Sequence, residues 1–297
     1  MVIDITKAIR FKNLLLLSFI FFSLELLFHI KAPLSQYSNI NLLAYFSVIL
    51  TAAAGYVIND YFDKDSDILN SKKNKTNLSE NRILILYYIL TLASILISSL
   101  FNNQLFFELV IVAHFALFLY SWKLKNLPLI GNLTIAILSG ICPLIMYITH
   151  PEIKQYLSTI NSFDVLELVI PFIYACLSFF TTFIREIIKD IEDYNGDKAL
   201  KAKTIPIIFS KEIAKFLAIL LLFAVTTFIL LIILNHNTIN IKIVTLLAII
   251  TLIFIPLIIT IRNTVLAKEK KDYTVISNLL KFIFASSNVV LLVHIFT

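Results

Sequence analysis

The chain has 297 residues, of which 59% are hydrophobic and 15% are charged, and its formal net charge is +6. Soluble globular proteins carry about 25% charged and 45–50% apolar residues. A chain this apolar cannot cover itself with polar side chains in water, so the composition excludes an ordinary soluble protein and indicates a membrane protein. Cys142 and Cys176 both lie in apolar runs, which excludes a disulfide scaffold and a cysteine-rich metal site.

The apolar runs predict nine transmembrane helices. A membrane-spanning helix needs about 20 mostly apolar residues. Lipid offers no partner for unpaired backbone groups, so each such run is expected to be helical. In chain order the predicted spans are 13–30, 39–59, 82–101, 104–121, 129–149, 164–186, 212–235, 241–262 and 276–296. The whole chain, 1–297, is therefore expected to form one polytopic domain.

The basic residues predict the orientation of these spans. With nine spans, 22 of the 25 Lys and Arg residues fall on the side that holds the N-terminus and the loops after spans 2, 4, 6 and 8. Only Lys31, Lys154 and Lys242 fall on the other side. This asymmetry predicts that the basic side is cytoplasmic and that the protein lies in the cell inner membrane. The net charge of +6 is then explained by membrane topology and an anionic ligand. We therefore expect no nucleic acid among the partners.

Seven of the ten aspartates lie in two short windows, residues 60–67 and 190–197. Both windows contain the spacing D-x-x-D-x-x-x-D, with an offset of 130 residues between them. Each window follows an even-numbered span, so both are expected on the cytoplasmic side. The matching spacing predicts an internal duplication that sets the clusters face to face across a cavity. The spaced aspartates are Asp60, Asp63, Asp67, Asp190, Asp193 and Asp197.

The aspartate spacing indicates a metal-binding chemistry. On a continuous helix, residues i, i+3 and i+7 place three carboxylates within about 60° of one face. Because like charges repel, six facing carboxylates are tolerable when cations lie among them. Carboxylate oxygens suit Mg²⁺, which usually shares its ligand shell with phosphate oxygens and water. The clusters therefore predict Mg²⁺ ions that clamp a diphosphate, and the alternative interpretation is a pair of solvated acidic helix ends.

Basic side chains near the acidic windows are candidates for contact with phosphate oxygens. The positive-inside rule alone explains some lysines in such loops. Arg185 stands apart because it is expected at the end of span 6, where an unpaired charge is costly. The candidates are Lys123, Lys125, Arg185, Lys189, Lys198, Lys201 and Lys203.

At these motifs the sequence resembles the UbiA superfamily of intramembrane prenyltransferases. The window from Asn59 to Asp67 looks like the family's N-D-x-x-D-x-x-x-D motif, and the window 190–197 looks like its second aspartate motif. Residues 119–132 contain Y-S-W-K-L-K and G-N, similar to the family's Y-S-x-x-L-K and G-N segment. Arg10 with Asn13 is similar to the N-terminal R-P-x-N motif, although Phe11 replaces the proline.

The resemblance implies nine helices around a central cavity that opens laterally to lipid, with a polyprenyl diphosphate donor, Mg²⁺ and a lipophilic acceptor. By position, Asn59 and the six aspartates would hold Mg²⁺ and diphosphate. Lys125 and Arg185 would neutralise the leaving group, and Lys189, Lys198 and Lys203 are further diphosphate candidates. Candidates for contact with the acceptor are Arg10, Asn13 and Tyr120.

Within the superfamily, the windows 185–197 and 203–206 look most like the digeranylgeranylglyceryl phosphate synthase branch. This resemblance implies geranylgeranyl diphosphate as donor and geranylgeranylglyceryl phosphate as acceptor. The segment after Asp67 departs from the family, because Asn70 is followed by S-K-K-N-K. An aromatic quinone precursor of the hydroxybenzoate or naphthoate type therefore stays open as the acceptor.

Two other classes of protein remain as alternatives. Repeated helical halves also build secondary transporters, whose acidic residues lie near the bilayer midplane. Glu25 is the one acid expected well inside a span, and a partnered structural role is favoured for it. The third class is a catalytically inactive scaffold. His114 is expected to be a hydrogen-bonded core residue, and the sequence determines neither the prenyl chain length nor the oligomeric state.

Overall fold

The structure is a computed structural model that describes residues 2–30, 41–64, 78–150, 165–238 and 241–297. Within this part of the chain all regular elements are helices, and nine of them are long and apolar enough to span a membrane. The prediction of an all-helical membrane protein with nine spans is confirmed for these residues. The spans are α2 (Phe11–Ile30), α3 (Leu42–Phe62), α5 (Glu80–Leu100), α6 (Gln104–Trp122), α7 (Ile130–Thr149), α9 (Val165–Glu192), α12 (Lys211–Leu234), the continuous unit α13 (Ile243–Ile249), η3 (Ile250–Phe254) and α14 (Ile255–Leu266), and α15 (Lys270–Phe296).

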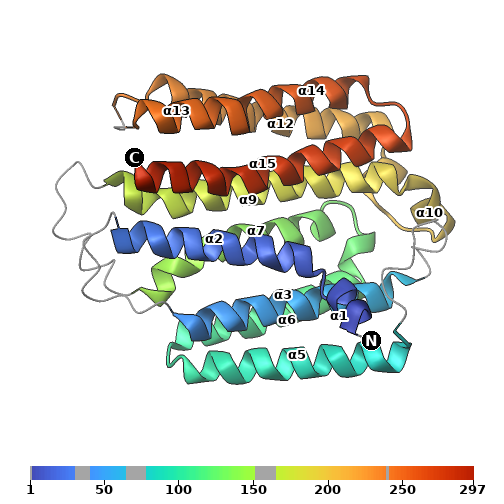
Figure 1. Cartoon of the computed structure of the whole chain (residues 1–297). Coiled ribbons are helices and arrows are strands. Elements are labelled where there is room, and N and C mark those ends of the chain that lie inside the picture. Colours follow the sequence, from blue (N-terminus) through green and yellow to red (C-terminus); the bar gives the residue numbers. More distant parts are fainter. Residues whose placement is uncertain (1, 31–40, 65–77, 151–164, 239–240) are drawn as a thin grey trace.

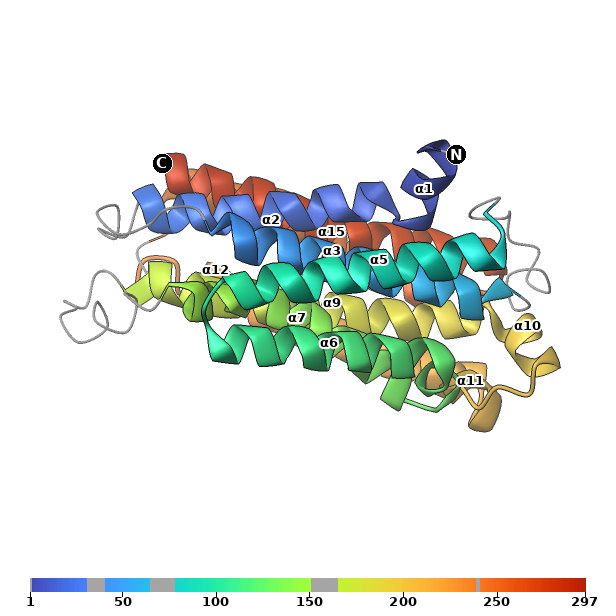
Figure 2. The same ribbon diagram turned by 90° about the horizontal axis from the view of Figure 1, so that it is seen from below.

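Short helices gather at one end of the bundle. Figure 1 shows α1 (Val2–Ala8) and α10 (Tyr194–Ala199) at the right-hand end, and Figure 2 places α11 (Ile205–Ile208) at the same end. The remaining short element is the 3₁₀ turn η2 (Leu124–Asn126), which follows α6. Of these elements, η2, α10 and α11 come from segments that carry the predicted aspartate and lysine motifs, and α1 precedes Arg10.

Six helices form a ring around a central cavity. Helix α9 packs against α7 and α15, α6 packs against α3 and α7, and α2 packs against α15 and α3. All six contribute side chains to the cavity lining. In Figure 1, α5 lies outside the ring below α3 and α6, and α12 to α14 lie above α9 and α15. The cavity therefore sits within the ring, and the other three spans support it from outside.

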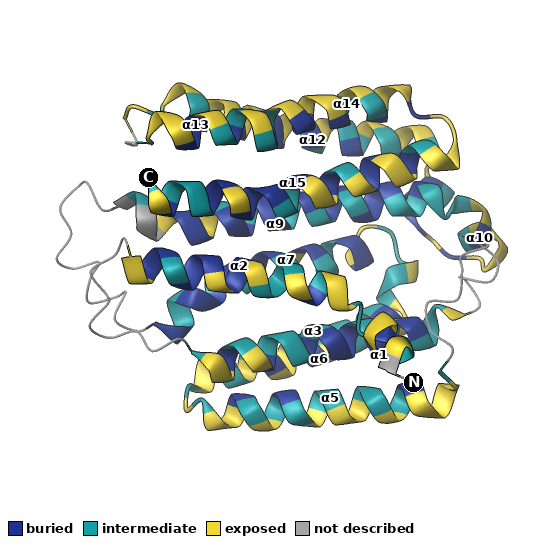
Figure 3. Ribbon diagram, viewed as in Figure 1, coloured by how far each residue is buried: buried dark blue, intermediate teal, exposed yellow. Residues whose placement is uncertain are grey.

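The outer helices present apolar side chains to the surroundings. On α5, Leu92 and Leu96 are 61% and 64% exposed. Figure 3 shows a similar concentration of exposed residues along α5 and along α12 to α14. Such apolar surface is favourable only when lipid surrounds it, because lipid tails are as apolar as leucine. The chain is accordingly an integral membrane protein.

Close helix contacts in the ring depend on small residues and hydroxyl groups. Thr51 Oγ1 on α3 lies 2.7 Å from Ser94 Oγ on α5 and 3.3 Å from His114 Nε2 on α6. Small and hydroxyl-bearing residues let helices approach closely in lipid, and interhelical hydrogen bonds add to the packing. His114 is buried, so the prediction that it is a hydrogen-bonded core residue is confirmed.

Several helices extend beyond the predicted spans at the charged end. Helix α9 continues to Glu192, beyond the predicted boundary at 186, and α15 begins at Lys270 instead of 276. Hydropathy underestimates these ends because their charged side chains face the cavity or water. As a consequence Arg185 lies inside α9, and Lys281 lies well inside α15 and not near its end. Of the three basic residues predicted for the opposite side, the structure describes Lys242, whose ammonium group contacts the Thr297 carbonyl oxygen.

Candidate active site

The cavity inside the ring has a volume of about 1220 Å³ and combines a charged end with an apolar body. The charged end lies beside the ends of α3 and α9 and the starts of α2 and α7. The apolar body runs between α2, α3, α6 and α7, past residues such as Leu17, Val48, Leu109 and Ile145. Val112 of α6 lines the cavity and is also 59% exposed. A charged end joined to an apolar body suits an amphiphilic ligand with a polar head and an apolar chain.

The first aspartate cluster lies where α3 ends. Asp63 is the residue after the last turn of α3, and its backbone N–H donates to the Asn59 carbonyl oxygen. The Asn59 side-chain amide donates to Asp63 Oδ2 at 2.5 Å, so these two side chains form one unit at the cavity wall. Asp60 is buried on another face and is not part of the cavity lining. Asp67, the third member of the cluster, lies outside the described residues.

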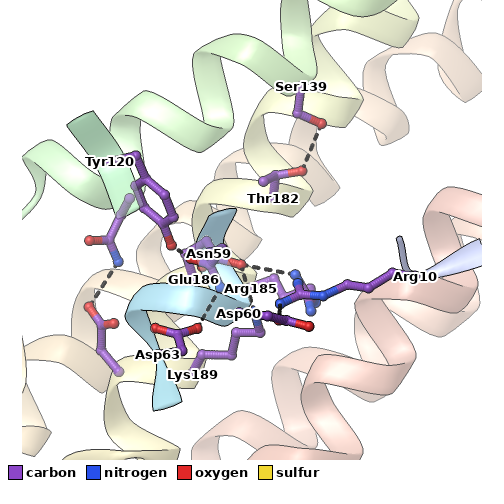
Figure 4. Close-up of polar contacts among 12 residues, drawn as sticks. Arg10, Asn59, Asp60, Asp63, Tyr120, Ser139, Thr182, Arg185, Glu186 and Lys189 are labelled. Carbon is purple, nitrogen blue, oxygen red and sulfur yellow. Dashed lines mark hydrogen bonds and ion pairs between the residues drawn. The ribbon is translucent and has the colours of Figure 1, made fainter. Parts of the chain in front are cut away.

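Arg10 holds Asp60 from the other side of the charged end. Arg10 Nη2 lies 3.0 Å from Asp60 Oδ1 (Figure 4). Its guanidinium also lies 4.8 Å from the centre of the Tyr56 ring. Burial opposes the charge of Arg10, but Asp60 and Tyr56 outweigh this cost and raise the pKa of Arg10 above its ordinary value. The backbone of Arg10 has φ +48°, a left-handed conformation that costs an L-residue roughly 1–2 kcal/mol. The local strain is offset by the ion pair that it makes possible.

Lys125 joins the first cluster from the turn η2. Its ammonium group lies 2.6 Å from Asp63 Oδ1. The position of η2 depends on Gly131 in the first turn of α7, because a Cβ there would lie 2.6 Å from the Leu124 carbonyl oxygen and 2.7 Å from Lys125 Cα. Glycine is therefore required for the close approach of the two segments. This contact explains why the lysine and the G-N pair occur together in the sequence.

The second aspartate cluster lies on α9 and α10. Asp190 is in the last turns of α9, and Asn132 of α7 donates to Asp190 Oδ2 at 2.9 Å. The helix ends at Glu192, and Asp193 precedes α10, which contains Asp197. All three aspartates line the same cavity as Asp63. The clusters of α3 and α9 are thus brought to one cavity.

The expectation of three carboxylates on one continuous helix face is wrong for the second cluster. The chain leaves the helical path between Glu192 and Tyr194, where Asp193 has φ −92° and ψ 5°. The predicted internal duplication remains a prediction.

Glu186 is the centre of a buried network that sequence reasoning did not identify as part of the site. Glu186 Oε1 lies 2.9 Å from Arg185 Nη1 and 3.1 Å from Lys189 Nζ. The Tyr120 hydroxyl of α6 donates to Glu186 Oε2 at 3.4 Å. Figure 4 shows Tyr120, Arg185, Glu186 and Lys189 grouped beside Asn59 and Asp63. The signal in the sequence is the position of Glu186 between two basic residues on a membrane helix, where a carboxylate is costly unless paired.

Asn132, which donates to Asp190, is another residue of the site that the sequence left without a role. Among the remaining candidates, Asn13 lines the cavity, whereas Lys198 and Lys203 do not. The Lys198 ammonium lies 5.7 Å from the centre of the Tyr194 ring. The backbone N–H of Lys203 donates to the Asn126 carbonyl oxygen at 2.8 Å, which ties the loop after α10 to η2. Lys198 and Lys203 remain predictions as diphosphate ligands.

The carboxylates fit Mg²⁺ when a diphosphate shares its coordination. Asp63, Asp190, Asp193 and Asp197 offer hard oxygen ligands to one cavity. In the part of the chain that the structure describes, no three Asp, Glu, His or Cys side chains converge closely enough to hold a metal ion by themselves. Mg²⁺ commonly binds one or two carboxylates and completes its octahedral shell with water and phosphate oxygens. The donor set therefore matches that mode of binding.

Glu25 does not belong to the cavity. Its carboxylate is buried and lies 3.2 Å from His150 Nε2, between α2 and the end of α7. Glu25 is absent from the cavity lining. The expectation that Glu25 has a structural partner is confirmed, and the one acid expected well inside a span does not line the cavity.

Comparison with known proteins gives the family. The model of the UbiA prenyltransferase family matches residues 16–280. The digeranylgeranylglyceryl phosphate synthase of Methanobrevibacter smithii is 34% identical over 190 residues, an alignment that covers 61% of this chain and 62% of the relative. The chain thus spans about 62% of the length of this curated relative.

Solved structures share the fold over nearly the whole chain. A structure described as a digeranylgeranylglyceryl phosphate synthase in membranes has a TM-score of 0.63 and 25% identity, covering 99% of this chain and 96% of its own. A UbiA homolog from Archaeoglobus fulgidus, bound to DMAPP and Mg²⁺, has a TM-score of 0.58 and 17% identity, covering 95% and 98%. Since the family model matches residues 16–280, a range that includes both aspartate windows, the chain belongs to the UbiA prenyltransferase family.

Proposed function

We propose that this protein transfers a prenyl group from a polyprenyl diphosphate to a lipophilic acceptor in a Mg²⁺-dependent reaction. The observation that carries the proposal is the arrangement of Asp63 and Asp190 at the charged end of one cavity whose body is apolar. The acidic residues suit a Mg²⁺–diphosphate head, and the apolar body suits a prenyl chain. The family membership and the DMAPP and Mg²⁺ bound by the Archaeoglobus fulgidus homolog support the same reaction.

The proposed acceptor is geranylgeranylglyceryl phosphate, and the proposed donor is geranylgeranyl diphosphate. The support is the name of the Methanobrevibacter smithii relative, whose product carries two geranylgeranyl groups on glyceryl phosphate. In the proposed orientation, the end with α1, α10 and α11 faces the cytoplasm, because most basic residues lie there. Water-borne Mg²⁺ would then reach the acidic residues while both prenyl chains stay in the apolar part of the membrane.

In the proposed mechanism the charged residues hold the diphosphate and balance its charge. Asn59, Asp63, Asp190, Asp193 and Asp197 would hold Mg²⁺ and diphosphate. When bound by these residues, Mg²⁺ would supply Lewis acidity, which draws negative charge from the diphosphate oxygens and eases cleavage of the allylic C–O bond. Basic side chains at the same end stabilise the negative charge that develops on the leaving group. These side chains are Lys125, Arg185 and Lys189.

The cavity body controls the fate of the allylic carbon. Breaking the C–O bond leaves the electron pair with diphosphate and a positive charge on the prenyl group. Apolar walls exclude water, which would otherwise consume the cation, and nearby ring faces favour positive charge. The rings that line the charged end include those of Tyr56, Phe62 and Tyr120. The acceptor hydroxyl oxygen then bonds to C1 and releases its proton.

The test is a transfer assay with purified protein in detergent. Geranylgeranyl diphosphate and Mg²⁺ are offered with geranylgeranylglyceryl phosphate, with a hydroxybenzoate or with a naphthoate, and prenylated product is quantified. We expect product with the glyceryl phosphate lipid and none after EDTA treatment. Asp63→Asn and Asp193→Asn should each reduce turnover at least about a hundredfold, because removing one charged ligand removes several kcal/mol of binding or transition-state stabilisation.

A carboxylate outside the cavity provides the matched control. Glu108 of α6 is exposed, bonds to Gln104 and is absent from the cavity lining. Glu108→Gln should keep full Mg²⁺-dependent turnover. If product formed with an aromatic acceptor and not with geranylgeranylglyceryl phosphate, the proposed acceptor would be wrong. Full activity in both aspartate variants would show that the proposed mechanism is wrong.

A further inference from the structure

The acidic residues that line the cavity are confined to one side, which we call the acidic wall and which also carries Lys125, Arg185 and Lys189. The acidic lining residues come from α3, α9 and α10: Asp63, Glu186, Asp190, Asp193 and Asp197. By contrast, the charged lining residues from α1, α2 and α15, together with Arg10 between α1 and α2, are all basic. We call this group the basic wall, and its members are Lys7, Arg10, Lys12 and Lys281. Since α2 packs against α15, these residues belong to one side of the ring.

Lys281 is the unusual member of the basic wall. It lies roughly 16 Å along the helix axis from Lys270, at about 1.5 Å per residue, within a membrane-spanning helix. The preference for basic residues in cytoplasmic loops accounts for Lys7 and Lys12, but not for a lysine at this depth. A charged residue inside a membrane helix is costly and is retained where it serves a ligand or a partner.

The surroundings of Lys281 favour an anion. Lys281 lines the cavity within electrostatic reach of two cations, Arg185 and Arg10, and under the weaker influence of two carboxylates, Glu186 and Glu192. Those two arginines have carboxylate partners, Asp60 and Glu186 respectively. Within the described residues, no carboxylate makes an ion pair with Lys281. Lys281 is thus a lysine inside a membrane helix that lines the cavity without an ion pair of its own, and an anionic group that docks beside it would supply one.

The identity of that anion follows from the division of the walls. A diphosphate that binds through Mg²⁺ needs carboxylates, which the acidic wall provides and the basic wall lacks. A phosphate monoester without a metal ion carries about −1.5 to −2 charges and binds directly to lysine and arginine side chains. We propose that Lys281 forms, with Arg10, a second anion subsite that holds the phosphate of the acceptor lipid. This inference rests on the proposed function, and it adds a residue that selects a phosphate-bearing acceptor.

The subsite would also orient the two substrates. With the donor diphosphate on the acidic wall and the acceptor phosphate on the basic wall, the two like-charged heads stay apart. The acceptor hydroxyl group, next to its phosphate on the glycerol, can then face the allylic carbon between the walls. Holding both reactants in a productive geometry supplies a large part of the rate enhancement in a two-substrate reaction.

The kinetic test compares Lys281→Gln, Lys281→Arg and a control, Lys271→Gln. Lys271 is exposed on the same helix and does not line the cavity. In Lys281→Gln we expect the KM for geranylgeranylglyceryl phosphate to rise at least about tenfold, while the KM for the donor changes less than about twofold. Lys281→Arg should recover most of the loss, and Lys271→Gln should match the wild type.

A second acceptor isolates the phosphate. Geranylgeranylglycerol has the same chain and the same hydroxyl group next to it on the glycerol, but a second hydroxyl group takes the place of the phosphate ester. The wild type should have a higher kcat/KM for geranylgeranylglyceryl phosphate than for geranylgeranylglycerol. In Lys281→Gln the ratio of these two kcat/KM values should fall by the same factor by which the KM for the phosphate lipid rises. An unchanged preference, or a change confined to the donor KM, would overturn the acceptor-phosphate assignment.

A binding measurement separates this inference from the proposed function. The thermal unfolding midpoint of the purified protein is measured with and without geranylgeranylglyceryl phosphate, in the absence of donor. Stabilisation of the wild type but not of Lys281→Gln would support the subsite even if no acceptor were prenylated. Equal stabilisation of both proteins, or none of the wild type, would overturn the subsite while leaving Mg²⁺-dependent prenyl transfer intact.

Discussion

The Lys125 ammonium group lies 2.6 Å from Asp63 Oδ1, which joins the turn after α6 to the end of α3 at the charged end of the cavity. The two side chains are 16% and 20% exposed, so the pair is shielded but within reach of a ligand in the cavity. The same ammonium group can therefore balance Asp63 and contact a diphosphate oxygen. The first prediction concerns this lysine.

Lys125→Ala should lower kcat/KM for the donor by about a hundredfold, because the variant loses a cation that stabilises the leaving group. Lys125→Arg should recover part of the activity, since it keeps the charge but not the compact point-charge geometry. Steady-state kinetics with varied donor concentration provide the measurement. A Lys125→Ala enzyme with wild-type donor kinetics would exclude this role.

Gly131→Ala should be more damaging than Gly55→Ala. A Cβ at position 131 meets backbone atoms of Leu124 and Lys125 at 2.6–2.7 Å, whereas a Cβ at position 55 meets the end of the flexible Leu117 side chain at 2.9 Å. The Leu117 side chain can change its rotamer to make room. At position 131 the backbone of η2 itself must shift, and Lys125 shifts with it. We expect Gly131→Ala to lower the unfolding midpoint further and to reduce donor affinity. Equal unfolding midpoints for the two variants would contradict the argument.

Glu186→Gln should destabilise the folded protein by about 2 kcal/mol or more, because Arg185 and Lys189 lose their shared carboxylate in a mostly buried site. Tyr120→Phe is the matched control, since it removes only a 3.4 Å hydrogen bond to the same carboxylate. Its expected cost is about 1 kcal/mol or less. Urea or thermal unfolding in detergent measures both, and similar losses in the two variants would count against the charge argument.

The buried pair of Glu25 and His150 should affect stability and leave the chemistry unchanged. Glu25→Ala leaves His150 without its 3.2 Å partner and should lower the unfolding midpoint. Since Glu25 does not line the cavity, KM values for donor and acceptor should stay within about twofold of the wild type. A large change in either KM at unchanged stability would point to a role of Glu25 in ligand binding.

Ala113 of α6 tests how the cavity body receives the prenyl chain. It lines the cavity roughly 10 Å along the helix axis from Tyr120 at the charged end, at about 1.5 Å per residue. Ala113→Phe fills space that a long chain needs, so activity with geranylgeranyl diphosphate should fall more than activity with dimethylallyl diphosphate. Ala116→Phe, on the same helix but outside the lining, should not change the ratio of the two activities.

The sequence alone determined the class of protein, the nine helices and the two acidic clusters. Apolar runs of about 20 residues have only one stable backbone arrangement in lipid, so composition and run length were sufficient. The matching spacing of the aspartates around Asp60 and Asp190 also indicated a metal–diphosphate site. These features are local, because they depend on residues close together in the chain and on the solvent around them.

Only the tertiary structure decided which side chains act together. Asp60 forms an ion pair with Arg10, Asp63 forms one with Lys125, and Asp190 accepts a hydrogen bond from Asn132. Each of these partners is far away in the sequence. Glu186 and Lys281 acquired their roles in the same way, because a position in the sequence does not say which face of a membrane helix meets lipid and which meets the cavity. That choice depends on the order of α2, α3, α6, α7, α9 and α15 around the ring. Helix packing fixes this order through long-range contacts, which hydropathy and residue spacing do not encode.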